Sequence, residues 1–173
     1  MHLIIAEKHD AAKRIAEILA GSKPRSQRIA GVEVFRFDDK VVVGLSGHIV
    51  GVDYPPGYNS WQKVDCRDLI RAEIVVRPIQ EKIISALERL GREADSITIA
   101  TDFDREGELI GVEALKIVQK VNPNLHVDRV RYSAIVREEI QKAFQKRGDV
   151  DYELAASGEA RQIIDLVWGA ALT

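Results

Sequence analysis

Three carboxylates occur within the segment TDFDREGE, at Asp102, Asp104 and Glu106. This segment follows an apolar run, residues 96–100 (SITIA), that is typical of a buried strand. Side chains two residues apart on extended backbone point the same way, and Glu106 falls in the first turn of the helix expected next. Carboxylates this close together repel, and a hard divalent cation removes the repulsion. The pattern predicts a magnesium site for phosphate-ester chemistry, and the lack of nearby His or Cys argues against zinc.

A simpler interpretation is that acids at the start of a helix interact with its dipole. That accounts for Glu106 and Glu108, but it does not account for Asp102 at the end of an apolar strand. We therefore favour metal binding for the set.

A second pair of charged residues, Glu7 and Lys8, directly follows the apolar run HLIIA at residues 2–6. In a doubly wound sheet this position lies at the carboxyl end of the first strand, across the active crevice from Asp102. A carboxyl group there can transfer a proton, and a lysine can neutralise charge on a phosphate. Such a pair is ordinarily a solvated ion pair, so Glu7 and Lys8 are candidate site residues only because of their position at the end of the first strand.

The sequence leaves the roles of two further residues, His48 and Arg105, undecided. His48 follows the apolar run VVVGLS and so ends a strand, where a histidine is more often a structural hydrogen-bonding group than a catalyst. Arg105, inside the acidic loop, either contacts phosphate or balances the acids.

The elements that must position these residues follow from hydrophobic spacing. The segments RIAGVEVFRF and KVVVGLSG predict antiparallel strands joined near Asp38 and Asp39, and residues 51–67 predict an ordered loop or insertion. The rest alternates between strands and helices, which predicts an α/β fold with a Rossmann-like, mostly parallel sheet flanked by helices and an antiparallel excursion near its front. The expected strands are 2–6, 96–100 and 127–133, and the expected helices are 10–20 (stopped by Gly21), 78–91 (from Pro78 to Gly91), 105–120, 137–146 and the tail from residue 151.

Composition narrows the class of protein. The formal net charge of -2 excludes a strongly basic nucleic-acid binder, so any DNA contact must come from local basic clusters or from outside this sequence. Cys66 is the only cysteine, which excludes a disulfide framework and fits a reducing cytoplasm. No apolar run reaches the roughly 18 residues of a membrane span. We expect a cytoplasmic protein with no membrane partner.

Four motifs together resemble the Toprim domain of type IA DNA topoisomerases, in the archaeal or topoisomerase III-like style. The resemblance covers nearly the whole chain, and DREGE together with the AR…D…WG segment is its most specific part. The motifs are IIAEK at 4–8, SGHIVG at 46–51, ATDFDREGE at 100–108 and GEARQIIDLVWGAALT at 158–173.

The resemblance implies the residue roles. The Toprim glutamate, here Glu7, is the general acid/base at the scissile phosphodiester, and Lys8 assists at the phosphate. Asp102, Asp104 and Glu106 bind Mg²⁺. We group Arg105 with the catalytic residues, and His48, Arg161 and Asp165 with the DNA path. The implied substrate is single-stranded DNA or underwound duplex.

In this family a tyrosine of a later domain attacks DNA, and we expect none of Tyr54, Tyr58, Tyr132 and Tyr152 to replace it. We expect residues 1–150 to form the Toprim domain and residues 151–173 to begin a following helical domain. The chain then works with the remaining domains of the same polypeptide and is inactive alone.

The nearest rival is a stand-alone Toprim nuclease that uses metal-bound water, and a non-catalytic DNA-binding module is a second. A haloacid dehalogenase-type phosphatase and a response-regulator receiver both place their acids after the first strand, unlike this chain. The sequence leaves open whether the parent is a topoisomerase I, a topoisomerase III or part of a reverse gyrase.

Overall fold

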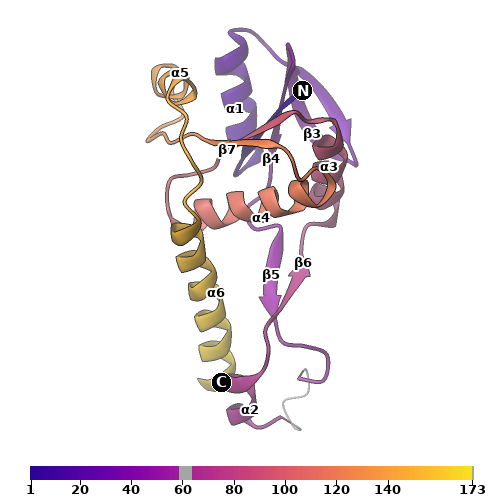
Figure 1. Ribbon diagram of the computed structural model, residues 1–173, viewed down its shortest axis with the longest axis vertical. Helices are drawn as coiled ribbons and strands as arrows, with labels where there is room; N and C mark the ends of the chain where they lie inside the picture. Colours follow the sequence, from indigo (N-terminus) through magenta and orange to yellow (C-terminus); the bar gives the residue numbers. More distant parts are fainter. Residues whose placement is uncertain (59–63, 173) are drawn as a thin grey trace.

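The computed structural model describes residues 1–58 and 64–172, and it has a six-stranded sheet at its centre (Figure 1). The strand order is β2-β3-β4-β1-β7-β8, in which β4, β1, β7 and β8 run parallel and β2-β3-β4 run antiparallel. The predicted fold class, a mostly parallel sheet with an antiparallel excursion, is confirmed. The strands of this sheet are β1 (His2–Ala6), β2 (Arg25–Ile29), β3 (Val32–Phe37), β4 (Lys40–Gly44), β7 (Ser96–Ala100) and β8 (His126–Arg129).

Helices cover both faces of this sheet because its central strands are apolar on both sides. In β1, Leu3 and Ile5 face one buried cluster, while Ile4 and Ala6 face the other. The first cluster includes apolar side chains of α3 and α4, and the second includes those of α1 and α5. This two-sided burial is what a doubly wound sheet requires. The helices are α1 (His9–Ala20), α3 (Glu81–Glu93), α4 (Arg105–Val121) and α5 (Arg137–Gln145).

An elongated arm extends from the sheet (Figure 1). It contains the antiparallel pair β5 (Val50–Asp53) and β6 (Val75–Pro78), the short helix α2 (Cys66–Arg71) and the long helix α6 (Tyr152–Leu172). Side chains of α2, α6 and the segment after β5 form a small third cluster. Thus the carboxyl-terminal half of α6 packs against α2 and the segment after β5, while its first half lies beside α4, where Gly158 comes close to Arg105 and Leu109.

The structure corrects several predicted boundaries. Pro78 does not begin a helix but ends β6, where its fixed φ and missing N–H are tolerated at a strand end, and α3 begins three residues later. Residues 51–67 contain part of β5 and the start of α2, and residues 59–63 of that predicted loop lie outside the described part. Strand β8 is shorter than expected because the chain turns after Arg129, whose backbone pairs with Gly148. No helix in the described ranges is long and apolar enough to cross a membrane.

Candidate active site at the carboxyl ends of β1 and β7

Strand register brings the two acidic segments to one edge of the sheet. Ala6, the last residue of β1, pairs with Gly44 of β4 on one side and with Ala100 of β7 on the other. Glu7 and the loop that begins at Thr101 therefore leave the sheet at the same level. This is the crevice at the carboxyl ends of parallel strands where ligands bind in open α/β sheets.

Glu7 is held by its backbone and is largely covered. Its carbonyl oxygen accepts hydrogen bonds from the amides of Ser46 (3.0 Å) and Gly47 (3.1 Å). Ser46 adopts a left-handed φ of 84°, a conformation uncommon for a non-glycine residue and often found at functional sites. The Glu7 side chain is only 13% exposed, and Lys8 Nζ lies 2.9 Å from its Oε1. The carboxyl group is thus held at the sheet edge beside the exposed ammonium group of Lys8.

Asp102 lies within the electrostatic reach of Glu7. Burial raises the pKa of Asp102, and the charges of Glu7 and Asp104 raise it further, while Lys8 and Arg129 oppose the shift. A carboxyl group in this position gains from any cation that enters. The strand register brings the two acids to this edge, and the raised pKa of Asp102, caused first by burial and then by the charge of Glu7, agrees with that placement.

Asp104 stabilises the start of α4, whether or not it also binds a metal ion. It is the N-cap of α4, and its Oδ1 accepts a hydrogen bond from the amide of Gly107 at 2.7 Å. A Cβ at Gly107 would stand 2.2 Å from the carbonyl oxygen of Asp102, so only glycine allows the loop to fold back so tightly over the helix start. One oxygen of Asp104 stays available to a ligand.

The acids do not yet form a complete metal cage. Within residues 1–58 and 64–172, no three His, Cys, Asp or Glu side chains are grouped so that they could hold an ion. Glu106 is 72% exposed and lies 3.6 Å from His48 Nε2. The donors at the edge are all carboxylate oxygens, which suit a hard divalent cation, but Asp102, Asp104 and Glu106 must rotate to share one.

A buried ion pair behind the acidic loop was missed by sequence reasoning, which explained Glu108 by the helix dipole. Glu108 and Arg129 both have fully buried side chains, and Nε and Nη2 of Arg129 each lie 2.8 Å from Glu108 Oε2. Arg129 also donates to the carbonyl oxygens of Thr101 (2.8 Å) and Asp102 (2.9 Å). Arg129 thereby fixes the backbone that carries Asp102. The signal was Glu108's position among apolar residues of the helix, since a buried acid needs a partner.

His48 belongs to a hydrogen-bond network that the sequence only half revealed. Its Nδ1 lies 3.0 Å from Oε1 of the buried Glu113, whose Oε2 accepts from the amide of Ile49 at 3.3 Å. The amide nitrogen of Gln162 in α6 is 3.1 Å from His48 Nε2. The hydrogen bond to Glu113 raises the pKa of His48, burial opposes it, and the charges of Glu113, Glu106 and Glu7 add to it. His48 therefore joins three elements and carries positive charge more readily than a free imidazole.

Five of the predicted residues line a single cavity beside this network. It has a volume of about 200 Å³ and lies between α4, α6 and the loop after β4. Arg161 and Asp165 are neighbours on α6, 3.6 Å apart and well exposed. The lining residues are His48, Arg105, Glu106, Leu109, Gly158, Arg161, Gln162 and Asp165.

The tyrosine nearest the acids is poorly suited to attack. The hydroxyl of Tyr132 donates to the carbonyl oxygen of Ala100 at 2.6 Å. Burial, together with the charges of Asp102 and Glu7, raises its pKa, which keeps the hydroxyl protonated. Tyr132 therefore supports the end of β7 instead of serving as a nucleophile.

The fold and the carboxylates at the ends of β1 and β7 are those of one protein family. A Toprim domain model matches residues 2–135, and the chain belongs to the Toprim family, whose domains bind divalent metal ions.

Particular relatives are also similar over nearly the whole chain. It is 49% identical to DNA topoisomerase 1 of Archaeoglobus fulgidus and 41% identical to DNA topoisomerase 1 of Thermoplasma acidophilum, in each case over 99% of this chain. It is 34% identical to human DNA topoisomerase 3-alpha over the same share. The matched part is 26%, 22% and 18% of those proteins respectively, so the chain spans about a quarter or less of their length.

One solved structure has the same fold. Full-length topoisomerase I from Thermotoga maritima aligns with a TM-score of 0.60 at 24% identity, covering 95% of this chain and 24% of that one.

Proposed function

We propose that this chain is the Toprim part of a type IA DNA topoisomerase and supplies the acidic half of a site for single-strand DNA cleavage and religation. The observation that carries the proposal is the meeting of Glu7 and Asp102 at one sheet edge, in a chain similar to DNA topoisomerases over 99% of its length. Its setting is the cytoplasm, its substrate is single-stranded or underwound DNA, and residues 151–173 lead into a following helical domain.

Each residue has a defined task in the proposed reaction. Glu7 protonates the 3′ oxygen that leaves when the strand is cut, and takes the proton back when that oxygen reseals the break. Lys8, 2.9 Å from Glu7, holds negative charge on the scissile phosphate. Arg105 and Arg161 line the cavity next to this edge and contact the backbone of the bound strand.

Asp102, Asp104 and Glu106 would hold Mg²⁺, which when bound positions phosphate oxygens and balances their charge. The need is visible in the raised pKa of Asp102, because an acid in that position is stabilised by a cation. Arg129 keeps the loop in place through the carbonyl oxygens of Thr101 and Asp102.

The nucleophilic tyrosine belongs to another part of the polypeptide. We expect the 173-residue chain alone to bind a divalent cation without relaxing DNA. A stand-alone nuclease is the alternative, and it predicts metal-dependent nicking of plasmid by this chain alone. Neither nicking nor relaxation is the expected result.

The test is a chimaera with the Archaeoglobus relative, in which this chain replaces the matching quarter of the protein. At 49% identity the replaced part should fold and dock. We expect the chimaera to relax negatively supercoiled plasmid with magnesium, and E7Q in it to lower the rate by about a hundredfold or more, the usual contribution of a general acid/base.

The matched control is E17Q, a glutamate in the second half of α1 that pairs with Arg14, about two helical turns from the acidic edge. It should leave the relaxation rate unchanged. A chimaera that folds but has equal activity with and without the Glu7 carboxyl group would refute the assignment.

A further inference from the structure

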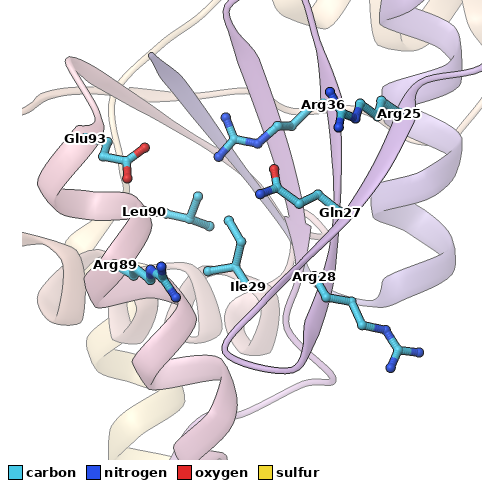
Figure 2. Close-up of a pocket in the computed structure, with 8 residues that line it drawn as sticks. All are labelled: Arg25, Gln27, Arg28, Ile29, Arg36, Arg89, Leu90 and Glu93. Atoms are coloured by element: carbon cyan, nitrogen blue, oxygen red, sulfur yellow. The ribbon is translucent and has the colours of Figure 1, made fainter.

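A cleft rich in arginine lies at the opposite end of the sheet from the acids. It has a volume of about 510 Å³ and lies between the β2-β3 edge and α3 (Figure 2). Its position follows from its neighbours: Arg36 contacts Met1, which precedes β1, and Arg89 lies on the last turns of α3, which leads to the start of β7. The lining residues are Arg25, Gln27, Arg28, Ile29, Arg36, Arg89, Leu90 and Glu93.

Most of the positive charge in this cleft has no counter-charge beside it. In the described ranges none of its four arginines forms an ion pair within 4 Å of a carboxylate, and only Arg28 faces an acid, Glu33, across the β2-β3 register. Glu93 is the single acid among the lining residues. Arg25 and Arg36 are direct cross-strand partners in the β2-β3 register. Like charges placed opposite each other in a sheet destabilise it, so this pairing costs stability unless an anion joins it.

Arg36 in particular has an unused donor. Among residues 1–58 and 64–172, its buried Nε has no hydrogen-bond partner, and its Nη1 donates to the weak acceptor Sδ of Met1, at 3.9 Å. A buried N–H without an acceptor is costly. In Figure 2 the Arg36 guanidinium points across the cleft towards α3, with the Gln27 amide beside it, whereas Arg28 points away.

The chemistry of the cleft selects its ligand. Guanidinium groups bind phosphate through paired N–H donors, and Leu90 and Ile29 supply an apolar floor against which a sugar or base can rest. The volume exceeds that of one phosphate group and suits a short stretch of backbone.

We propose that this cleft binds the phosphodiester backbone of a DNA strand, remote from the cleavage site. The choice of DNA rests on the proposed function, whereas the anion site itself does not. Arg36 on the sheet side and Arg89 on α3 donate hydrogen bonds to the phosphate oxygens, and Arg25 adds positive charge at the rim of the cleft. The cleft is a local basic cluster of the kind that a chain of net charge -2 needs to hold DNA.

The test compares two double variants of this chain without magnesium. R36Q/R89Q removes the two walls of the cleft, and R92Q/R137Q removes the same charge at exposed sites on α3 and α5 that do not line it. Anisotropy of a labelled single-stranded oligonucleotide should show roughly tenfold weaker binding for the cleft variant than for the control. The salt slope should fall by about 0.7 for each lost phosphate contact.

A direct readout is the Nε–H resonance of Arg36, which should shift when the oligonucleotide or pyrophosphate is added. R36Q/R89Q should melt no lower than the unmodified chain, because the like-charge pair is gone; if it fails to fold, the exposed single change R89Q gives the same comparison. Equal affinities for the two double variants would overturn the proposal. A shift with pyrophosphate but not with DNA, or equally tight binding of polyglutamate, would also overturn it.

Failure of this cleft and failure of the proposed function are distinguishable. Binding here is measured without magnesium on the chain alone, and relaxation is measured on the chimaera through Glu7. A negative result in the binding experiment does not contradict the proposed function, and a negative result in the relaxation experiment does not contradict anion binding in the cleft.

Discussion

The buried Glu108–Arg129 pair offers the sharpest test of how this fold supports its acidic edge. The two oxygens of Glu108 accept different donors: Oε2 accepts from Nε and Nη2 of Arg129, and Oε1 accepts from the amide of Asp151, with distances of 2.8 Å. In E108Q a single amide oxygen remains, so the new NH₂ group must face a donor, and Arg129 keeps a buried charge without its counter-charge.

Breaking one side of a buried pair costs about 3–5 kcal/mol. For a chain of this size that is a fall of roughly 6–20 °C in melting temperature, at about 2–4 °C per kcal/mol. Urea unfolding at pH 7, with the slope against denaturant unchanged, measures the loss. R129M should cost at least as much, because the carbonyl oxygens of Thr101 and Asp102 lose donors as well.

The control is E106Q on the same helix, with a side chain 72% exposed, which should change the free energy of unfolding by no more than about 0.5 kcal/mol. A loss below about 1 kcal/mol for E108Q would refute the reasoning, because the pair could then not be holding the loop.

Three further predictions follow from pKa shifts and packing. Because burial and neighbouring acids raise the pKa of Asp102 above its ordinary 3.8, the stability it contributes is full below that value and is lost as the pH rises through the raised pKa. D102N should therefore unfold at higher urea than the unmodified chain at pH 7 without metal, and the gap should close in acid. The pKa of His48 is raised above 6.5, chiefly by its hydrogen bond to Glu113, so E113Q should lower that pKa in an NMR titration of the imidazole. In the unmodified chain the stability that protonated His48 contributes is full below pH 6.5 and is lost as the pH rises through the raised pKa. In E113Q this loss should occur at lower pH. On α6, G158A should cost about 1–3 kcal/mol in thermal unfolding, because its Cβ would stand 2.7 Å from the carbonyl oxygen of Arg105 on α4.

The parts of the fold that could be predicted are those that depend on short stretches of sequence. β1 and β7 are short apolar runs, and an acid follows each within two residues, so chain order and the rule for parallel strands were enough to place Glu7 near Asp102. Gly21 ends α1 with a left-handed φ of 67°, as its position after the last apolar residue indicated.

Other parts depend on partners distant in the chain. β5 and β6 have no fully buried position, so neither is the apolar run that marks a buried strand, and each pairs with the other across more than 20 residues. Glu108 and Glu113 resemble solvent-facing acids of a helix until Arg129 and His48 are placed beside them. No local pattern carries such pairings.

The same distinction shows why a net charge of -2 does not argue against the DNA contacts proposed above. Its charges are separated to the two ends of one sheet: carboxylates gather where β1 and β7 end, and arginines gather beside the first residues of β1. Each gathering is unfavourable by itself, as the raised pKa of Asp102 and the cross-strand pairing of Arg25 with Arg36 indicate. Under the two proposals a cation would stabilise one end and a phosphate backbone the other, so binding at either end would relieve repulsion that folding creates. Net charge, which sums the two ends to -2, hides both.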